Sequence, residues 1–260
     1  MNTDRKTTTS EEGKLDTNRQ AAPGMTSSRK IALAAGLLYL LTFISIPTLS
    51  LYGPVHETSY IAGAGPDTPI IVGGILEIIV ALAGIGTAVA LYPVVKRQNE
   101  GVALGFVGSR TLEAATIFAG VVSLLSVVTM RQSGVKADAL VISHALVALY
   151  DRTFLLGQSI MPAVNALLLG SLLYKSRLVP RALPVLGLLG SPLLFAAQIA
   201  IMFGLIDRIS AWAAILALPI ALWEFSLGVW LVARGFNPSA ITSEFDKMDI
   251  GGEKTSMSAA

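Results

Sequence analysis

Four ionisable side chains lie inside long apolar stretches of this sequence: Glu77, Arg110, Glu113 and Glu224. A charge near the centre of a bilayer costs from about 3 to over 10 kcal/mol, so such groups should face the protein interior and find a partner there. Side chains of these types can bind an ion, a proton or a polar solute. They can equally form a purely structural polar network that fixes the register of the helices.

Arg110 and Glu113 are three residues apart, a spacing that puts both on one face of a helix and allows a direct ion pair. Glu77 and Glu224 have no cation nearby in the sequence. Each must therefore be protonated, bonded to Arg110 across a helix bundle, or reached by water. We expect all four side chains to point inward and to share Arg110 as one cluster.

No enzyme chemistry is indicated by the sequence. It holds no usable nucleophile, zinc-protease, phosphate-loop or dinucleotide motif, and without cysteine it has no thiol nucleophile or thiolate metal site. The histidines, His56 and His144, have only Glu57 and Asp151 as candidate carboxylate neighbours, which makes a haem or zinc site a poor hypothesis. We expect a protein that is not an enzyme and has no metal and no cofactor.

The elements that must position the four charges are membrane-spanning helices. The chain is 53% hydrophobic and 14% charged, well outside the balance of soluble proteins. Its apolar residues form blocks of about twenty, the length that crosses about 30 Å of hydrocarbon as a helix. The sequence predicts an all-α polytopic bundle with spans at Ile31–Leu51, Pro69–Tyr92, Val102–Met130, Thr153–Tyr174, Leu183–Ile206 and Ala211–Ala233.

Between the third and fourth spans, residues 138–152 contain about a dozen mostly apolar positions bracketed by Asp138, Asp151 and Arg152. The stretch is too short to span a bilayer and too apolar for an ordinary loop, so it predicts a short interfacial helix.

The two ends of the chain are polar, and we predict disordered cytoplasmic tails over residues 1–28 and 237–260 around a transmembrane domain at 29–236. Six spans put both termini on one side of the membrane. Basic residues gather at the span ends of that side, which predicts that it is cytoplasmic: Arg29, Lys30, Lys96, Arg97, Lys175, Arg177, Arg181 and Arg234. The net charge of +2 is too small to indicate a nucleic-acid partner.

Three stretches carry a resemblance to a known family: SRTLEAA, NALLLGSLLYKSRLVPRALPVLG and WEFSLGVWLVARGF. Over about Arg29 to Asn237 the chain resembles the bacterial multi-pass membrane family called domain of unknown function 4386. The resemblance implies a helix bundle in a bacterial cytoplasmic membrane, without activity, substrate or cofactor. Its recurring positions match Arg110, Glu113, Tyr174, Pro180, Arg181, Glu224 and Trp230, whereas Asn165 and Ala166 stand where it leads us to expect His and Cys, and Trp223 where it implies Gly.

Two hypotheses about function follow. The first is a non-catalytic membrane component, structural or partner-binding, because no catalytic constellation is found and the ends of the chain are long and polar. Its partners would be the lipid bilayer and a protein, which includes a second copy of the chain. The alternative is a carrier or an ion- or solute-binding protein with the buried site Glu77, Arg110, Glu113 and Glu224.

Overall fold

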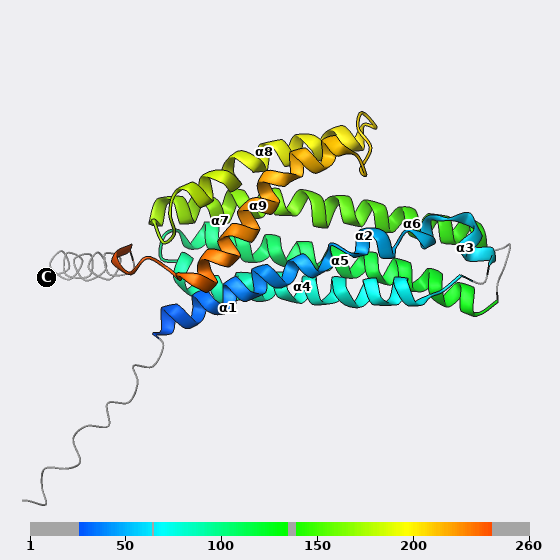
Figure 1. Cartoon of the computed structure of the whole chain (residues 1–260), viewed down its shortest axis with the longest axis horizontal. Helices are drawn as coiled ribbons and strands as arrows, with labels where there is room; N and C mark the ends of the chain where they lie inside the picture. Colours follow the sequence, from blue (N-terminus) through cyan, green and yellow to red (C-terminus); the bar gives the residue numbers. More distant parts are fainter. Residues whose placement is uncertain (1–25, 64, 135–138, 241–260) are drawn as a thin grey trace, which may run out of the picture.

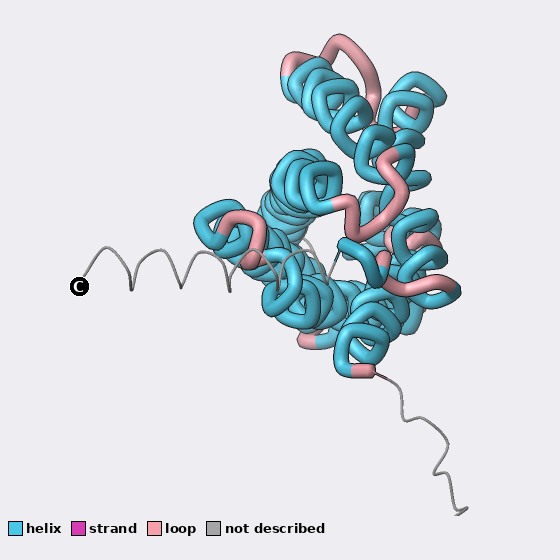
Figure 2. The backbone as a smooth tube through the Cα atoms, turned by 90° about the vertical axis from the view of Figure 1, so that its left-hand side faces the viewer, coloured by secondary structure: helices cyan, strands magenta, loops and turns pink. Residues whose placement is uncertain are grey.

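The computed structural model describes residues 26–63, 65–134 and 139–240, and every regular element in these ranges is a helix (Figure 2). Six helical stretches are long and apolar enough to cross a membrane, which confirms the predicted bundle. The spanning elements are α1 (Ser27–Leu41) with η1 (Thr42–Ser45), α4 (Thr68–Val95), α5 (Glu100–Gln132), α6 (Ala139–Phe154) with η3 (Leu155–Ile160) and α7 (Met161–Ser176), α8 (Ala182–Met202) and α9 (Ala211–Ala233).

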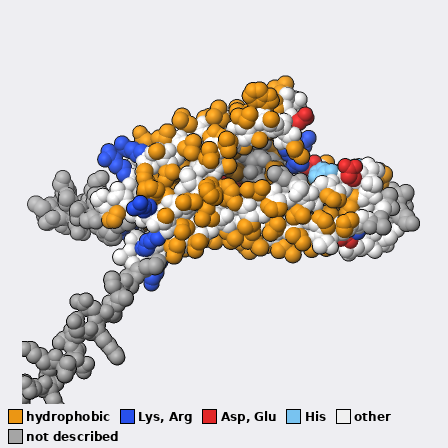
Figure 3. Space-filling view, in the orientation of Figure 1, with side chains coloured by type: hydrophobic (Ala, Val, Ile, Leu, Met, Phe, Trp, Pro, Cys, Tyr) orange, Lys and Arg blue, Asp and Glu red, His pale blue; other side chains and the backbone are white. Residues whose placement is uncertain are grey.

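Helix α1 begins, and helix α9 ends, at the same end of the bundle (Figure 1). Lys and Arg gather there in the space-filling view (Figure 3), and we call it the basic end. It carries Arg29, Lys96, Lys175, Arg181 and Arg234. We call the opposite end, with His56, Asp67, Arg131 and Arg208, the far end. The predicted tails fall mostly on residues 1–25 and 241–260, outside the described residues, and α1 already begins at Ser27.

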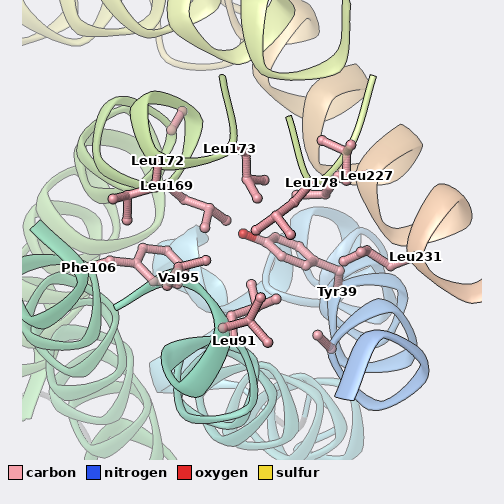
Figure 4. Packing of buried hydrophobic residues seen from close by; sticks show 14 of the residues in the cluster. Tyr39, Leu91, Val95, Phe106, Leu169, Leu172, Leu173, Leu178, Leu227 and Leu231 are labelled. Atoms are coloured by element: carbon pink, nitrogen blue, oxygen red, sulfur yellow. The ribbon is translucent and has the colours of Figure 1, made fainter. Parts of the chain in front are cut away.

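A large apolar core lies in the half of the bundle next to the basic end (Figure 4). Tyr39 of α1, Leu91 of α4, Phe106 of α5 and Leu169 of α7 meet there, each at most 1% exposed. Helix α9 joins them through Leu227, which is fully buried. This packing holds all six spans together, because Leu194 of α8 also belongs to the core. It fixes the angular position of Arg110, which follows Phe106 by four residues on α5.

The predicted interfacial helix does not lie apart from the spans. Helix α6 continues through the π-helical turn η3 into α7 as one stretch of 38 residues, and it packs along α5. Its buried face holds Ser143, Val147 and Tyr150, which repeat at helical spacing. The apolar residues of 138–152 are therefore explained by packing against α5 as much as by lipid.

The first span ends earlier than predicted, at Ser45. Pro47 follows, and because proline lacks an N–H the chain there breaks into the short elements α2 (Thr48–Leu51), η2 (Pro54–His56) and α3 (Thr58–Ala62). Buried Tyr52 and Tyr60 from this segment pack against the far ends of α4, α5 and α6. The segment caps the far end of the bundle.

The helices differ greatly in length, and the two that form the outer wall of the candidate site, α8 and α9, are short. Helix α5 has 33 residues, or about 50 Å, whereas α8 and α9 have 21 and 23, or about 32 to 35 Å. The hairpin of α8 and α9 packs on the bundle near the basic end and stands away from it toward its tip (Figure 1). A hollow opens between the hairpin and the bundle (Figure 3).

Candidate functional site

Arg110 is the centre of the buried polar site. It lies on α5, is 3% exposed, and donates through Nη1 to Glu113 Oε2 at 3.0 Å and through Nη2 to Glu224 Oε1 at 2.7 Å. The first contact follows from the three-residue spacing, and the second joins α5 to α9. The rings of Tyr39 and Phe106 lie 5.3 and 5.8 Å from the guanidinium carbon, within cation–π range.

A fourth residue, Asn165 of α7, completes this central cluster. Its Nδ2 donates to Glu113 Oε2 at 2.7 Å, so one carboxylate oxygen receives hydrogen bonds from two helices. Asn165 Oδ1 and Arg110 Nε are buried and have no hydrogen-bond partner among the described residues. The sequence had singled out Asn165 only as a departure from a family pattern. Its role here is to bind a carboxylate.

Glu77 does not join the central cluster, so the expectation of one cluster around Arg110 is wrong for this residue. The fully buried Glu77 accepts hydrogen bonds at Oε1 from Tyr150 and from Gln158, both at 3.0 Å. No Lys, Arg or His in the described ranges forms an ion pair with it. The Arg110 side chain instead passes Gly84 of α4, seven positions further along the helix, where an added Cβ would lie 3.9 Å from Arg110 Cδ.

A cavity of about 760 Å³ lies between the α8–α9 hairpin and the bundle, and we call it the hairpin cavity. It reaches from the central cluster, where Arg110, Glu113 and Glu224 line it, to Arg208 and Ser210 at the hairpin tip. Most of the remaining wall is apolar, and it includes Val80, Ile117, Leu194, Ile201, Ala217 and Ile220. A mainly apolar cavity with a few convergent polar groups is the usual form of a small-molecule site.

The cluster lies deep in the membrane part of the protein. Arg110 is ten residues from the start of α5 and Glu224 nine from the end of α9, distances of about 15 Å along each helix. That is about half of a hydrocarbon core of about 30 Å. Glu224 has the more exposed carboxylate, at 15% against 10% for Glu113. Both carboxylates line the hairpin cavity, and Glu224 is slightly the more open to it.

Asp151 ties the hairpin tip to the bundle at the far end of the cavity. Its Oδ1 lies 3.0 Å from Arg208 Nη2 of the hairpin and 3.2 Å from His56 Nε2. His56 Nδ1 donates to the Tyr52 carbonyl at 2.8 Å. The hydrogen bond to Asp151 raises the pKa of His56 above its usual value, although burial and the nearby Arg208 oppose this. Arg208 also lies over the Phe154 ring at 5.2 Å.

One known protein family matches nearly the whole helix bundle. The model of the family described as Domain of unknown function (DUF4386) matches residues 34–235. The chain belongs to this family. The resemblance inferred from the three sequence stretches is thereby confirmed, and the DUF4386 match contains the central cluster, Glu77 and the hairpin tip. No curated protein and no solved structure matches the chain.

The described residues give this DUF4386 site two carboxylates, one guanidinium and one amide. If both carboxylates of the central cluster are ionised, two negative charges face one guanidinium. Sequence reasoning found three of the four polar residues that meet there and missed Asn165. It also missed Tyr150 and Gln158, the partners of Glu77. A tyrosine and a glutamine in an apolar stretch are common, and only their helical spacing relative to Ser143 and Val147 would have suggested a buried face.

Proposed function

We propose that this protein is a solute-binding membrane protein or carrier, and that it binds an amphipathic molecule with an apolar body and a positively charged head group. The observation that carries the proposal is the hairpin cavity, about 760 Å³ in volume, which ends at a buried cluster with more carboxylates than cations.

The charge of the head group follows from the partners of Arg110. Its guanidinium is already bonded to both Glu113 and Glu224. An anionic ligand would therefore face two carboxylates and, among the described residues of the cluster, only a cation that is already paired. Arg208 at the other end of the cavity is paired with Asp151. A positive head group beside Glu224 would balance the second carboxylate, and in a low-dielectric site this balance is worth far more than it is in water.

Two probes of matched size and opposite charge test the proposal: tetraphenylphosphonium, a cation, and tetraphenylborate, an anion. Binding is measured by equilibrium dialysis against the purified protein in detergent. We expect the cation to bind and the Glu224→Gln variant to bind it at least about tenfold more weakly, which is 1.4 kcal/mol. The matched control is Glu100→Gln, which removes the same charge from an exposed position at the start of α5.

Glu224→Gln could lose binding simply because it does not fold, so a second variant that keeps every charge is also tested. Ala217→Trp places a large ring in the cavity wall and should abolish binding of the cation. Equal binding of the two probes, or full binding by both Glu224→Gln and Ala217→Trp, would overturn the proposal.

The alternative is a structural or partner-binding component in which the central cluster only fixes helix register. It predicts that neither probe binds to the cavity, and that crosslinking in native membranes recovers a specific protein partner. The size of the cavity favours the solute-binding proposal, because a network that serves register alone gains nothing from an open space beside it.

We propose further that the basic end faces the cytoplasm of a bacterial inner membrane, because Lys and Arg concentrate there. The absence of native cysteine makes a direct test simple. A membrane-impermeant maleimide applied to intact cells should label Glu57→Cys at the far end and spare Lys96→Cys at the basic end. The reverse pattern would invert the orientation.

A further inference from the structure

A second cavity, of about 560 Å³, lies at the basic end between the connection that follows α7 and the end of α9. We call it the basic pocket. Arg177 and Arg181 line it from the connection, and Trp230 and Arg234 from α9 and its C-terminus. No Asp or Glu is among its lining residues in the described part of the chain. Three arginines thus line a pocket far from the hairpin cavity, and the guanidinium of Arg181 also lies 4.9 Å from the Tyr174 ring.

The walls of the basic pocket are built into the fold. Leu178 and Val179 are at most 2% exposed, and Phe236 is 7% exposed. The backbone N–H of Asn237 donates to the Leu178 carbonyl at 2.8 Å, which fastens the segment after α9 to the connection after α7. The backbone of the pocket is therefore held in place by the fold, whereas its three arginine side chains are exposed.

The N-terminus of α8 also favours an anion at the pocket. Helix α8 begins at Ala182, directly after Arg181, and the N-terminus of a helix carries a partial positive charge. The opposing partial negative charge at the end of α9 is neutralised by Arg29, which donates through Nη1 to the Leu231 carbonyl at 2.7 Å and through Nη2 to that of Val232.

We propose that the basic pocket binds a phosphate-bearing anion, the head group of an acidic phospholipid or free phosphate. Guanidinium groups suit phosphate because they donate in a planar fork, and Trp230 offers the kind of amphipathic ring that lies at the level of lipid head groups. Basic pockets between spanning helices are a recognised setting for lipid head groups. The position of the pocket at the ends of α7, α8 and α9 puts it at the membrane surface.

The test compares two triple variants that lose the same charge at the same end of the protein. One is Arg177→Gln with Arg181→Gln and Arg234→Gln, in the pocket. The control is Lys30→Gln with Lys96→Gln and Lys175→Gln, none of which lines it. Thermal unfolding is followed in detergent with added phosphatidylglycerol, phosphatidylcholine or inorganic phosphate. Arg181→Gln and Arg234→Gln as a double variant serves if the triple one does not fold.

We expect phosphatidylglycerol, but not phosphatidylcholine, to raise the melting temperature of the parent and of the lysine control, and to leave the arginine variant unchanged. Each arginine should contribute about fivefold to affinity, so the triple variant should bind roughly 100-fold more weakly. Equal stabilisation by inorganic phosphate would identify free phosphate as the ligand. Stabilisation that is lost equally in both triple variants, or absent from the parent, would overturn the proposal.

Discussion

Replacing Glu113 with Gln should destabilise the protein far more than replacing Glu77 with Gln, although both are buried glutamates in spanning helices. Glu113 lies 3.0 Å from Arg110, and removal of one member of a buried ion pair typically costs about 3 to 5 kcal/mol. Because Arg110 keeps Glu224 as a partner, we expect a cost near the lower end, about 3 kcal/mol.

The change at Glu77 is different because no cation loses its partner. A glutamine keeps the oxygen that accepts from Tyr150 and Gln158, so the loss should stay within about 1 kcal/mol. This expectation follows from a carboxyl that is 0% exposed and bonded only to neutral donors, a setting in which the neutral acid is favoured over the charged form.

The assay is reversible unfolding by denaturant in mixed micelles at neutral pH, with Glu100→Gln as the surface control. Similar losses for Glu77→Gln and Glu113→Gln would refute the reasoning, since Glu77 would then be ionised and balanced by a charge. An unchanged stability of Glu113→Gln would show that Glu224 alone neutralises Arg110. Glu113 would then be retained without any gain in stability, and the search for a ligand should begin there.

Two further predictions concern the far end and the helix crossing near the basic end. The raised pKa of His56 means that its contact with Asp151 stabilises the folded state fully below about pH 6.5 and loses this effect as the pH rises through the raised value. Melting curves of parent and His56→Gln across pH should therefore converge at high pH, and parallel profiles would contradict this. Gly36→Ala should cost about 1 to 3 kcal/mol, because its Cβ would lie 2.8 Å from the Gly228 carbonyl oxygen. Gly108→Ala, with nothing within 4 Å, should instead be neutral or stabilising by up to about 1 kcal/mol in the same denaturant assay, and equal effects of the two changes would argue against this helix crossing.

The sequence predicted the spans well because each needs only local information. Apolar length and flanking charge define a spanning helix, and the last span was predicted with the ends that the structure shows, Ala211–Ala233. The predicted elements were wrong where apolar residues pack against other helices instead of facing lipid, and where a proline ends a helix. The residues of α6 contact α5 rather than lying alone at the interface, and Pro47 ends the first span before its apolar residues do.

The candidate site was predictable only in part, for the same reason. The pair of Arg110 and Glu113 depends on a three-residue spacing within one helix. Arg110 and Glu224, in contrast, are 114 residues apart and meet only because α9 packs against α1 and α8 in the bundle. Glu77 faces α6 and η3, a direction that nothing in its local sequence indicates. The hairpin cavity depends on the tilt of α8 and α9 relative to the bundle. The length of a span and its flanking charges do not determine this tilt.

The unequal helix lengths have a consequence for the surrounding lipid. A helix of about 50 Å such as α5 would need to tilt by more than about 50° to fit a hydrocarbon core of about 30 Å, which is beyond the range of tilts that spanning helices adopt. The hairpin matches such a core without adjustment. The protein therefore presents two hydrophobic thicknesses to one bilayer, with exposed Val141, Ile142 and Leu149 of α6 on the tall side. Lipid must thicken there or leave these side chains at the head-group level, and the resulting mismatch would favour thicker membranes and neighbours of similar height.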